Sequence, residues 1–270
     1  MKRPLERQTK IVADRAADLI KNDRQKAAVE LITRFFKKYR NRVYIKVMKK
    51  FAITCRKTYG IDVPTIRAIA KCLSRSVLTG DAGLSILKEL WVTHFFENKM
   101  LAGMLLYPAA ESHIHRYQGN FHGIIDFLDK IIPDFENWAV CDTLCTSGFD
   151  RLVSKYPDEF FPALFKWSKQ KNIWKKRVPA ATIAGYCSAK NFDVKKSLQL
   201  LSNLIGIEEK YVFKAVTWAF RNISKRNPGD VFLYLKGLLN RADNPVIKST
   251  ISQSSQKLPA HLRKKLLKIT

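Results

Sequence analysis

Two side chains in the stretch "ENWAVCD" have the types and the spacing that chemistry requires. Trp138 and Asp142 lie four residues apart in an otherwise apolar segment. If the segment is helical, both side chains leave the same face about one turn apart. An indole face attracts cations, and a fixed carboxylate stabilises positive charge. The pair is either a working site for positive charge or a structural feature, namely a salt-bridge remnant or a core anchor.

The charge balance of the chain predicts a polyanionic partner. The 270 residues include 49 Lys and Arg against 23 Asp and Glu, which gives a net charge of +26. Such an excess costs self-repulsion, and binding to nucleic acid is the simplest explanation for it. No apolar run reaches the roughly 18 residues of a membrane-spanning helix, and the opening "MKRPLERQTK" is too polar for a signal peptide. We therefore expect nucleic acid rather than a membrane as the partner.

The cysteines and histidines indicate neither disulfides nor a metal site. The number of cysteines is odd and they are scattered, which favours a reducing intracellular setting, in the cytoplasm or nucleoid. Cys141 and Cys145 share a helical face, but two thiols alone do not make a zinc site. His113 and His115 are two residues apart, so they do not share a helical face. We expect no metal and no organic cofactor, and buried cysteines that act as small hydrophobic residues.

The periodicity of the apolar residues predicts an all-α fold. Glycines (11) and prolines (10) are few. They fall between apolar blocks, and blocks such as "LSILKELWVTHFF" and "YVFKAVTWAFRNI" repeat with the period of a helix. No run of alternating residues between hairpin turns predicts a sheet.

An internal repeat predicts an α-solenoid, in which helix pairs stack along one axis. The segments "ENKMLAGMLL", "ENWAVCDTLC", "KKRVPAATIA", "VFKAVTWAFR" and "VIKSTISQSS" align with one another at intervals of 39, 39, 37 and 34 residues. We expect a single domain over residues 1–270, with basic N-terminal helices over about 1–60, stacked helix pairs over about 61–255 and a basic tail over 256–270. The third positions of the aligned segments are Lys99, Trp138, Arg177, Lys214 and Lys248.

Equivalent positions of successive repeats line one surface of a solenoid, usually the concave one. The third positions are basic in four repeats, and one turn later Asp142 and Trp218 occupy matching places. A basic groove with two indoles and one carboxylate is suited to nucleic acid. The residues expected to share this groove are Lys99, Trp138, Asp142, Arg177, Lys214, Trp218 and Lys248.

The segment from Leu31 to Ile61 has ten basic residues and no acidic one, with aromatic residues between them. It is either a helix pair with a solvated cationic face and an aromatic core, or a clamp on phosphates at one end of the groove. The two interpretations are compatible. The tail "LRKKLLKIT" predicts a short basic terminal helix.

Several blocks of the chain resemble the AlkD-type DNA alkylation repair proteins. The blocks are "GIDVPTIRAIAK", "LKELWVTHFFENKMLAGMLL", "NWAVCD", "NIWKKRVPAATIAGY" and "YVFKAVTWAFRNISKRNP", in the family's order. The resemblance runs from about Arg34 to about Leu239. It implies a solenoid of HEAT-like repeats with a cationic concave face. It also implies hydrolysis of the N-glycosidic bond of cationic N3- and N7-alkylated purines in DNA, as in base excision repair.

The resemblance also implies roles for individual residues. The family's W-x-x-x-D pair matches Trp138 and Asp142, its phosphate-contacting arginine matches Arg177, and its second cleft tryptophan matches Trp218. A tyrosine of the family falls on Phe51, so contacts at that end of the cleft are open. We expect Asp142, Trp138 and Trp218 in catalysis, and DNA contacts from Phe51, Lys99, Arg177, Lys214 and Lys248.

Two other functions remain open on the sequence. One is a non-catalytic DNA-binding relative that grips branched or distorted DNA, and the other is a scaffold for acidic proteins. The remaining tryptophans, Trp91, Trp167 and Trp174, are expected to pack between helices. We expect a monofunctional enzyme, without a lyase step, that acts on duplex DNA as a monomer with no obligate protein partner.

Overall fold

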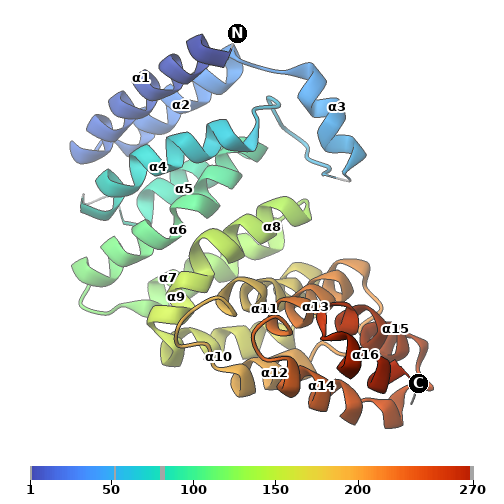
Figure 1. Ribbon diagram of the computed structural model, residues 1–270. Coiled ribbons are helices and arrows are strands. Elements are labelled where there is room, and N and C mark those ends of the chain that lie inside the picture. The colour runs from blue at the N-terminus through green and yellow to red at the C-terminus, as the bar shows by residue number, and fades with distance from the viewer. Residues whose placement is uncertain (1, 52, 80–82, 268–270) are drawn as a thin grey trace. The chain divides into compact units, whose positions relative to one another are not determined.

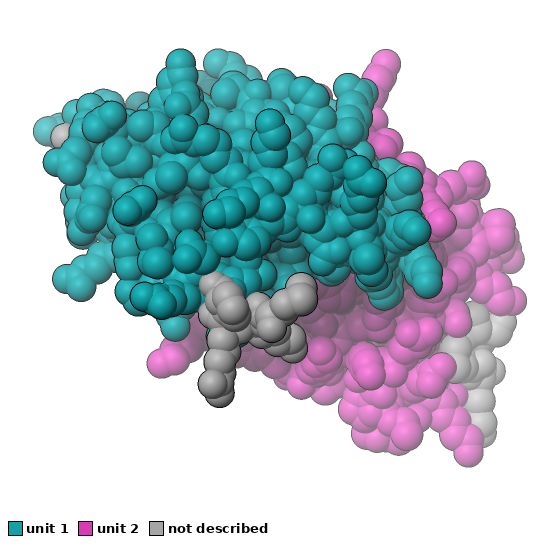
Figure 2. Space-filling model, turned by 90° about the horizontal axis from the view of Figure 1, so that it is seen from above, with its two compact units in different colours: residues 1–149 teal, residues 150–270 magenta. Residues whose placement is uncertain are grey.

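The computed structural model of the chain describes residues 2–51, 53–79 and 83–267 (Figure 1). Throughout these ranges the regular structure is helical, without a β-strand. This confirms the all-α prediction. None of the helices in these ranges combines the length and the apolar character that a membrane crossing requires. The chain divides into two compact units, residues 1–149 and 150–270 (Figure 2).

In the first unit, helices pack in sequence along the chain. Helix α1 packs against α2 and α4, α4 packs against α6, and α6 packs against α5 and α8, while α2 packs against α5. A 3-10 turn, Ile132–Asp134, and a π-helical turn, Cys145–Phe149, stand on either side of α8. The α-helices are α1 (Lys2–Lys21), α2 (Gln25–Lys38), α3 (Arg42–Lys50), α4 (Val63–Thr79), α5 (Ser85–Trp91), α6 (Phe96–Arg116), α7 (Phe121–Ile131) and α8 (Trp138–Leu144).

Two glycines let α6 and the segment from α8 to the π-helical turn approach each other closely. A Cβ atom at Gly103 would lie 3.0 Å from the backbone nitrogen of Leu144, and one at Gly148 would lie 2.7 Å from the Cβ of Leu106. Neither position leaves room for a larger side chain without movement of its neighbours. The close approach holds α8, which carries Trp138 and Asp142, against the core of the first unit.

In the second unit, α11 packs against α9, α10, α12 and α13, and α13 packs against α15. Helices α11, α13 and α15 therefore follow one another in space as they do along the chain. The helices are α9 (Asp150–Lys155), α10 (Pro157–Ser168), α11 (Ile173–Tyr186), α12 (Val194–Ser202), α13 (Lys210–Ile223), α14 (Pro228–Gly237), α15 (Pro245–Ser254) and α16 (Ala260–Leu267), with 3-10 turns Leu239–Arg241 and Ser255–Lys257.

The core confirms several predictions about individual residues. Trp91, Trp167 and Trp174 are buried, as expected of packing residues. Cys141, Cys145 and Cys187 are buried cysteines outside any disulfide, while Cys55 and Cys72 are half-buried. The terminal helix is present as α16.

One helix prediction is wrong in its extent. The block "LSILKELWVTHFF" is interrupted, because α5 ends at Trp91 and α6 begins at Phe96. The turn between them places His94 in the left-handed region, at φ +58°. Its sequence has neither glycine nor proline, so the usual signals of a break are missing.

Candidate functional site

Helix α8 carries the tryptophan and the carboxylate one turn apart. Asn137 caps the helix, since its side chain accepts a hydrogen bond from the backbone nitrogen of Val140 at 3.1 Å. Trp138 is the first residue of the helix, and Asp142 follows one turn later. Both are half-buried, between the buried residues of α8 and solvent. The four-residue spacing therefore places both side chains on one helical face, as the sequence predicts.

The backbone widens immediately after this pair. Residues Cys145–Phe149 form a π-helical turn that continues α8. The hydroxyl of Thr146 donates a hydrogen bond to the backbone carbonyl of Asp142 at 2.8 Å. Short π-helical turns are rare within helices and are frequent at functional sites. The irregular turn begins three residues after Asp142.

The indole of Trp138 is tied to the loop that follows α3. Its Nε1 donates a hydrogen bond to the backbone carbonyl of Phe51 at 3.3 Å. The two preceding residues bind the same loop. Asn137 Nδ2 donates to the carbonyl of Thr54 at 2.9 Å, and the backbone nitrogen of Arg56 donates to Glu136 Oε2 at 2.6 Å. Three consecutive residues, from Glu136 to Trp138, thus bind this loop at Phe51, Thr54 and Arg56.

A buried carboxylate fixes the other half of this loop. Glu97, in the first turn of α6, has no solvent-exposed surface. Its Oε1 accepts hydrogen bonds from the hydroxyl of Thr58 at 2.7 Å and from the backbone nitrogens of Tyr59, Gly60 and Ile61 at 3.0, 2.7 and 3.2 Å. Converging donors of this kind stabilise a buried negative charge. Residues 53–61 are therefore held at several points although they form no helix.

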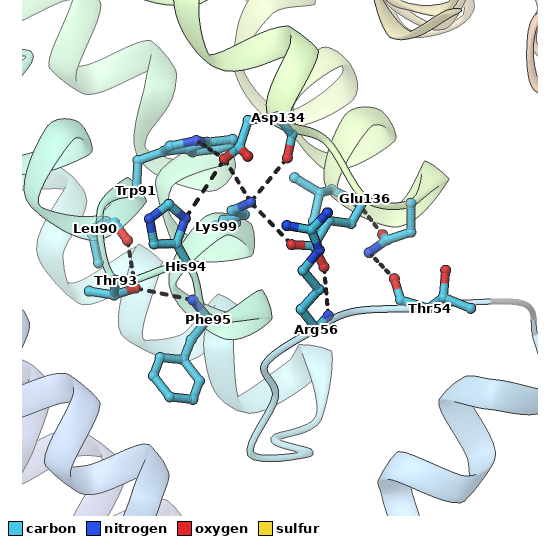
Figure 3. A network of polar contacts seen from close by, with 12 residues as sticks. Thr54, Arg56, Leu90, Trp91, Thr93, His94, Phe95, Lys99, Asp134 and Glu136 are labelled. Carbon is cyan, nitrogen blue, oxygen red and sulfur yellow. Dashed lines mark hydrogen bonds and ion pairs between the residues drawn. The ribbon is translucent and has the colours of Figure 1, made fainter.

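Lys99 lies in a polar cluster at the entry to α8 (Figure 3). The side chain is only 3% exposed. Its Nζ lies 2.9 Å from Asp134 Oδ2 and 3.7 Å from Glu136 Oε1, and it sits over the ring of Trp91 at 5.1 Å from the ring centre. The indole nitrogen of Trp91 donates to the same carboxylate oxygen of Asp134 at 2.9 Å.

This position differs from the prediction that Lys99 contacts DNA in an open groove. The ammonium group is already satisfied by protein carboxylates and is closed off from solvent, so it serves as an internal counter-ion. Because Glu136 also holds the nitrogen of Arg56, Lys99 supports the loop beside Trp138 indirectly.

The thiol of Cys55, in the loop beside Trp138, is held in its protonated form. Burial, together with the charges of Glu97 and Glu136, raises the pKa of the Cys55 thiol to about 11. The group is therefore protonated at neutral pH, and the thiolate is the reactive form of cysteine. Within the described ranges no cluster of His, Cys, Asp and Glu could hold a metal ion.

The N-caps of α8, α11 and α13 align these three helices differently from the repeated sequence segments. Asn137, Asn172 and Glu209 cap α8, α11 and α13 through their side chains. Counted from these caps, Asp142, Arg177 and Lys214 each stand five residues into their helices. The alignment had instead placed Trp138 opposite Arg177 and Lys214. In the register of the helices themselves, a carboxylate in α8 replaces the cation that α11 and α13 carry.

The second unit carries the other predicted site residues on α11, α13 and α15. Arg177 is 4% exposed, and its Nη1 donates a hydrogen bond to the backbone carbonyl of Tyr211, which links α11 to α13. Trp218 is half-buried, and Lys214 and Lys248 are exposed. The two lysines are thus open to an anion, whereas the guanidinium of Arg177 is buried in a contact between α11 and α13.

The residues that shape the site but escaped the sequence analysis are Glu97, Asp134, Glu136 and Asn137. Asn137 had a readable signal, because asparagine before an apolar helical run is a common N-cap. The others act on partners far away in the sequence. Glu97, for example, accepts hydrogen bonds from the Thr58 hydroxyl and from three backbone nitrogens 36 to 39 residues earlier.

Comparison with protein families shows which family the chain resembles. The family model described as DNA alkylation repair enzyme matches residues 32–253, which is most of the chain and includes both units. A comparison with curated proteins found no match to this sequence. The family match includes every residue named above as part of the candidate site.

Proposed function

Because the chain belongs to the DNA alkylation repair enzyme family, we propose that it is a monofunctional DNA glycosylase for cationic alkylated purines. Its substrates are N3- and N7-alkylated bases in duplex DNA, and its reaction is hydrolysis of the N-glycosidic bond. The reaction is the first step of base excision repair.

The chemistry of this substrate requires few protein groups. Alkylation at N3 or N7 makes the purine a cation, so it leaves as a neutral base and needs no general acid. As the bond between C1′ and the base nitrogen breaks, positive charge develops on the deoxyribose. Water then forms a bond to C1′ and loses a proton to the carboxylate or to solvent. A preorganised carboxylate stabilises this charge and orients the water.

Asp142 fits the role of this carboxylate, and Trp138 that of the adjacent cation-attracting surface. The observation that carries the proposal is that both side chains share one face at the start of α8 and remain half-buried. A carboxylate that stands where related helices have Arg177 and Lys214 is a poor choice for phosphate binding alone. It suits a site where positive charge develops on the sugar of a bound polyanion.

DNA binding is assigned to the cations of the second unit and to the basic segment before α4. Lys214 and Lys248 are exposed and suited to phosphates, and Trp218 adds an indole for the nucleotide. Arg177 is buried and donates to the carbonyl of Tyr211, so in this proposal it positions α13, which carries Lys214 and Trp218. In this proposal the helices form a HEAT-like solenoid whose basic face binds the duplex, and the protein acts as a monomer.

The direct test is release of free 7-methylguanine from methylated duplex DNA by the purified protein. We expect release that continues in the presence of a chelator, because the reaction needs no Lewis acid. Strong salt-dependent DNA binding without release would instead favour the non-catalytic DNA-binding relative. Binding that a short acidic peptide outcompetes would favour a protein scaffold.

A further inference from the structure

The orientation of the Trp138 indole depends on a loop that has no helix of its own. Its Nε1 donates a hydrogen bond to the backbone carbonyl of Phe51 at 3.3 Å. Because Trp138 is only half-buried, the core does not enclose its ring. A hydrogen bond to a loop carbonyl fixes a ring only if the loop itself is fixed. The position of the indole therefore depends on what holds the loop after α3.

The start of α6 is the platform on which this loop rests. The backbone nitrogen of Phe96 donates to the carbonyl of Lys57 at 2.9 Å. The ring of Tyr59 stacks on the ring of Phe95, with the ring centres 4.2 Å apart. The ammonium group of Lys57 lies 5.8 Å from the centre of the same Phe95 ring. These contacts restrain a segment that would otherwise have the mobility usual for loops.

Glu97 is the central contact of this platform. Its Oε1 accepts four hydrogen bonds from residues 58–61, at 2.7 to 3.2 Å. Gly60, one of these donors, has φ +77°, and a Cβ atom there would lie 2.2 Å from the carbonyl oxygen of Asn41, so the close approach requires glycine. The backbone nitrogen of Asn41, the N-cap of α3, donates to the carbonyl of Tyr59 at 2.8 Å. Glu97 thus fixes the point where the loop returns to the start of α3.

The carboxylate of Glu97 lies too deep to touch a substrate. Its side chain has no solvent-exposed surface, so DNA cannot contact it. The described residues give its second oxygen, Oε2, no hydrogen bond. The hydrogen bonds from residues 58–61 are therefore the polar contacts that offset its burial. Any influence of Glu97 on a reaction is exerted through the residues that it holds.

We propose that Glu97 is a positioning residue for the glycosylase reaction, which it supports by fixing the loop that holds the indole of Trp138. The inference rests on the proposed function and adds to it a residue that lies away from the substrate. The path runs from Oε1 of Glu97 through residues 58–61 and α3 to the carbonyl of Phe51, which accepts the hydrogen bond of Trp138. Loss of this support should slow excision and leave DNA affinity nearly unchanged.

The first kinetic test is Thr58→Val, which removes one of the four donors and keeps the shape of the side chain. We expect the single-turnover rate of 7-methylguanine excision to fall ~3- to 10-fold and duplex affinity to stay within ~2-fold, because a displaced indole weakens transition-state stabilisation more than DNA binding. The matched control is Thr9→Val in α1. It removes a hydroxyl that donates to the carbonyl of Leu5 at 2.8 Å, and it should leave the rate unchanged.

Replacement of Glu97 itself should have a larger effect. Glu97→Ala removes the acceptor of all four donors, and we expect the rate to fall by roughly 10- to 100-fold, the scale for a displacement of about 1 Å at a reacting centre. Glu97→Gln keeps an oxygen for the donors and should hold the rate within ~3-fold of the unaltered protein. If thermal unfolding shows that Glu97→Ala does not fold, Thr58→Val carries the test.

Fluorine NMR of protein labelled with 5-fluorotryptophan measures the environment of the indole without any reaction. The Trp138 signal is assigned from its absence in Trp138→Phe. In Thr58→Val this signal should shift or broaden, because the loop that holds the indole is loosened. The signals of the tryptophans of the second unit should stay in place, and these are Trp167, Trp174 and Trp218.

A double-mutant cycle tests whether the effect passes through the indole hydrogen bond. Trp138→Phe removes the N–H group, so adding Thr58→Val to this variant should change its rate less than ~2-fold. Rate losses that multiply in the double variant would overturn the path through Trp138.

The inference is also overturned if Thr58→Val and a folded Glu97→Ala excise 7-methylguanine like the Thr9→Val control and leave the Trp138 signal in place. Excision by the unaltered protein together with that result contradicts this inference alone. A shifted Trp138 signal without any excision by the unaltered protein supports Glu97 as the residue that holds the indole and contradicts the proposed chemistry.

Discussion

The indole nitrogen of Trp138 donates a hydrogen bond to the backbone carbonyl of Phe51, 87 residues earlier in the chain, at 3.3 Å. This bond couples the orientation of the indole to the loop after α3. Glu136 and Asn137 bind the same loop, so the entry to α8 and the loop form one hydrogen-bonded unit. A change in the conformation of the loop would therefore shift the start of α8, the helix that carries Asp142.

Replacement of Trp138 by phenylalanine removes the N–H group and keeps an aromatic ring. We expect the free energy of unfolding to fall by ~0.5–1.5 kcal/mol, the usual net value of a hydrogen bond. Backbone amides of residues 53–61 should exchange hydrogen faster, which mass spectrometry of exchanged peptides measures. Trp167→Phe, in the core of the second unit, is the control and should leave exchange of this loop unchanged.

Replacement of Glu97 separates its charge from its role as an acceptor. Glu97→Ala leaves four donors of the loop without their common partner, and we expect a loss of at least ~3 kcal/mol of stability in chemical denaturation. Glu97→Gln keeps an oxygen for these donors and should cost less than half as much. Equal losses of stability in the two variants would show that Glu97 stabilises the fold by packing and not by hydrogen bonding.

Replacement of Lys99 tests whether this residue is an internal counter-ion or a contact to DNA. Lys99→Met keeps the length of the side chain but leaves Asp134 and Glu136 without their ammonium partner. We expect a loss of roughly 2–3 kcal/mol of stability, below the value for fully buried pairs because both carboxylates are partly exposed. The salt slope of DNA binding should not change, whereas Lys214→Ala should make it shallower by about 0.9. A shallower slope for Lys99→Met would restore the prediction made from the sequence.

The burial of Lys99 could not be predicted from the sequence. The helical pattern, the packing tryptophans and the spacing of Trp138 and Asp142 depend on local periodicity, and all were predictable. The partners of Lys99 lie 35 and 37 residues further along, and no local pattern distinguishes a lysine that pairs with them from one that faces solvent. The hydrogen bond between Trp138 and Phe51 could not be predicted for the same reason, since the two residues are 87 positions apart. The register of Asp142 was missed because the alignment followed residue types, whereas the caps at Asn137 and Asn172 fix where each helix begins.

Asp150, the first residue of α9, makes stability depend on pH. Burial raises the pKa of its carboxyl from 3.8 to about 6. Between about pH 4 and pH 6 the folded state therefore holds a proton that the unfolded chain releases. The contribution of Asp150 to stability falls as pH rises through this window and is constant above it.

We expect Asp150→Asn to raise the free energy of unfolding at pH 7.5 by of order 1–2 kcal/mol and to have little effect at pH 4. Denaturation curves across this pH range measure the difference. The exposed Asp158, changed to Asn, is the control and should show no such dependence. A stabilisation by Asp150→Asn that is equal at pH 4 and pH 7.5 would contradict the titration.

The single-turnover rate of 7-methylguanine excision by Asp142→Asn tests the central claim most directly. Asparagine keeps the shape of the side chain and removes its charge. If the carboxylate stabilises positive charge on the sugar, the rate falls by roughly 10²–10³, the scale for losing one preorganised electrostatic group. Duplex binding holds or tightens because a negative charge facing a polyanion is gone, and the melting temperature does not fall. Excision by Asp142→Asn at the rate of the unaltered protein would contradict the assignment of Asp142 as the catalytic carboxylate.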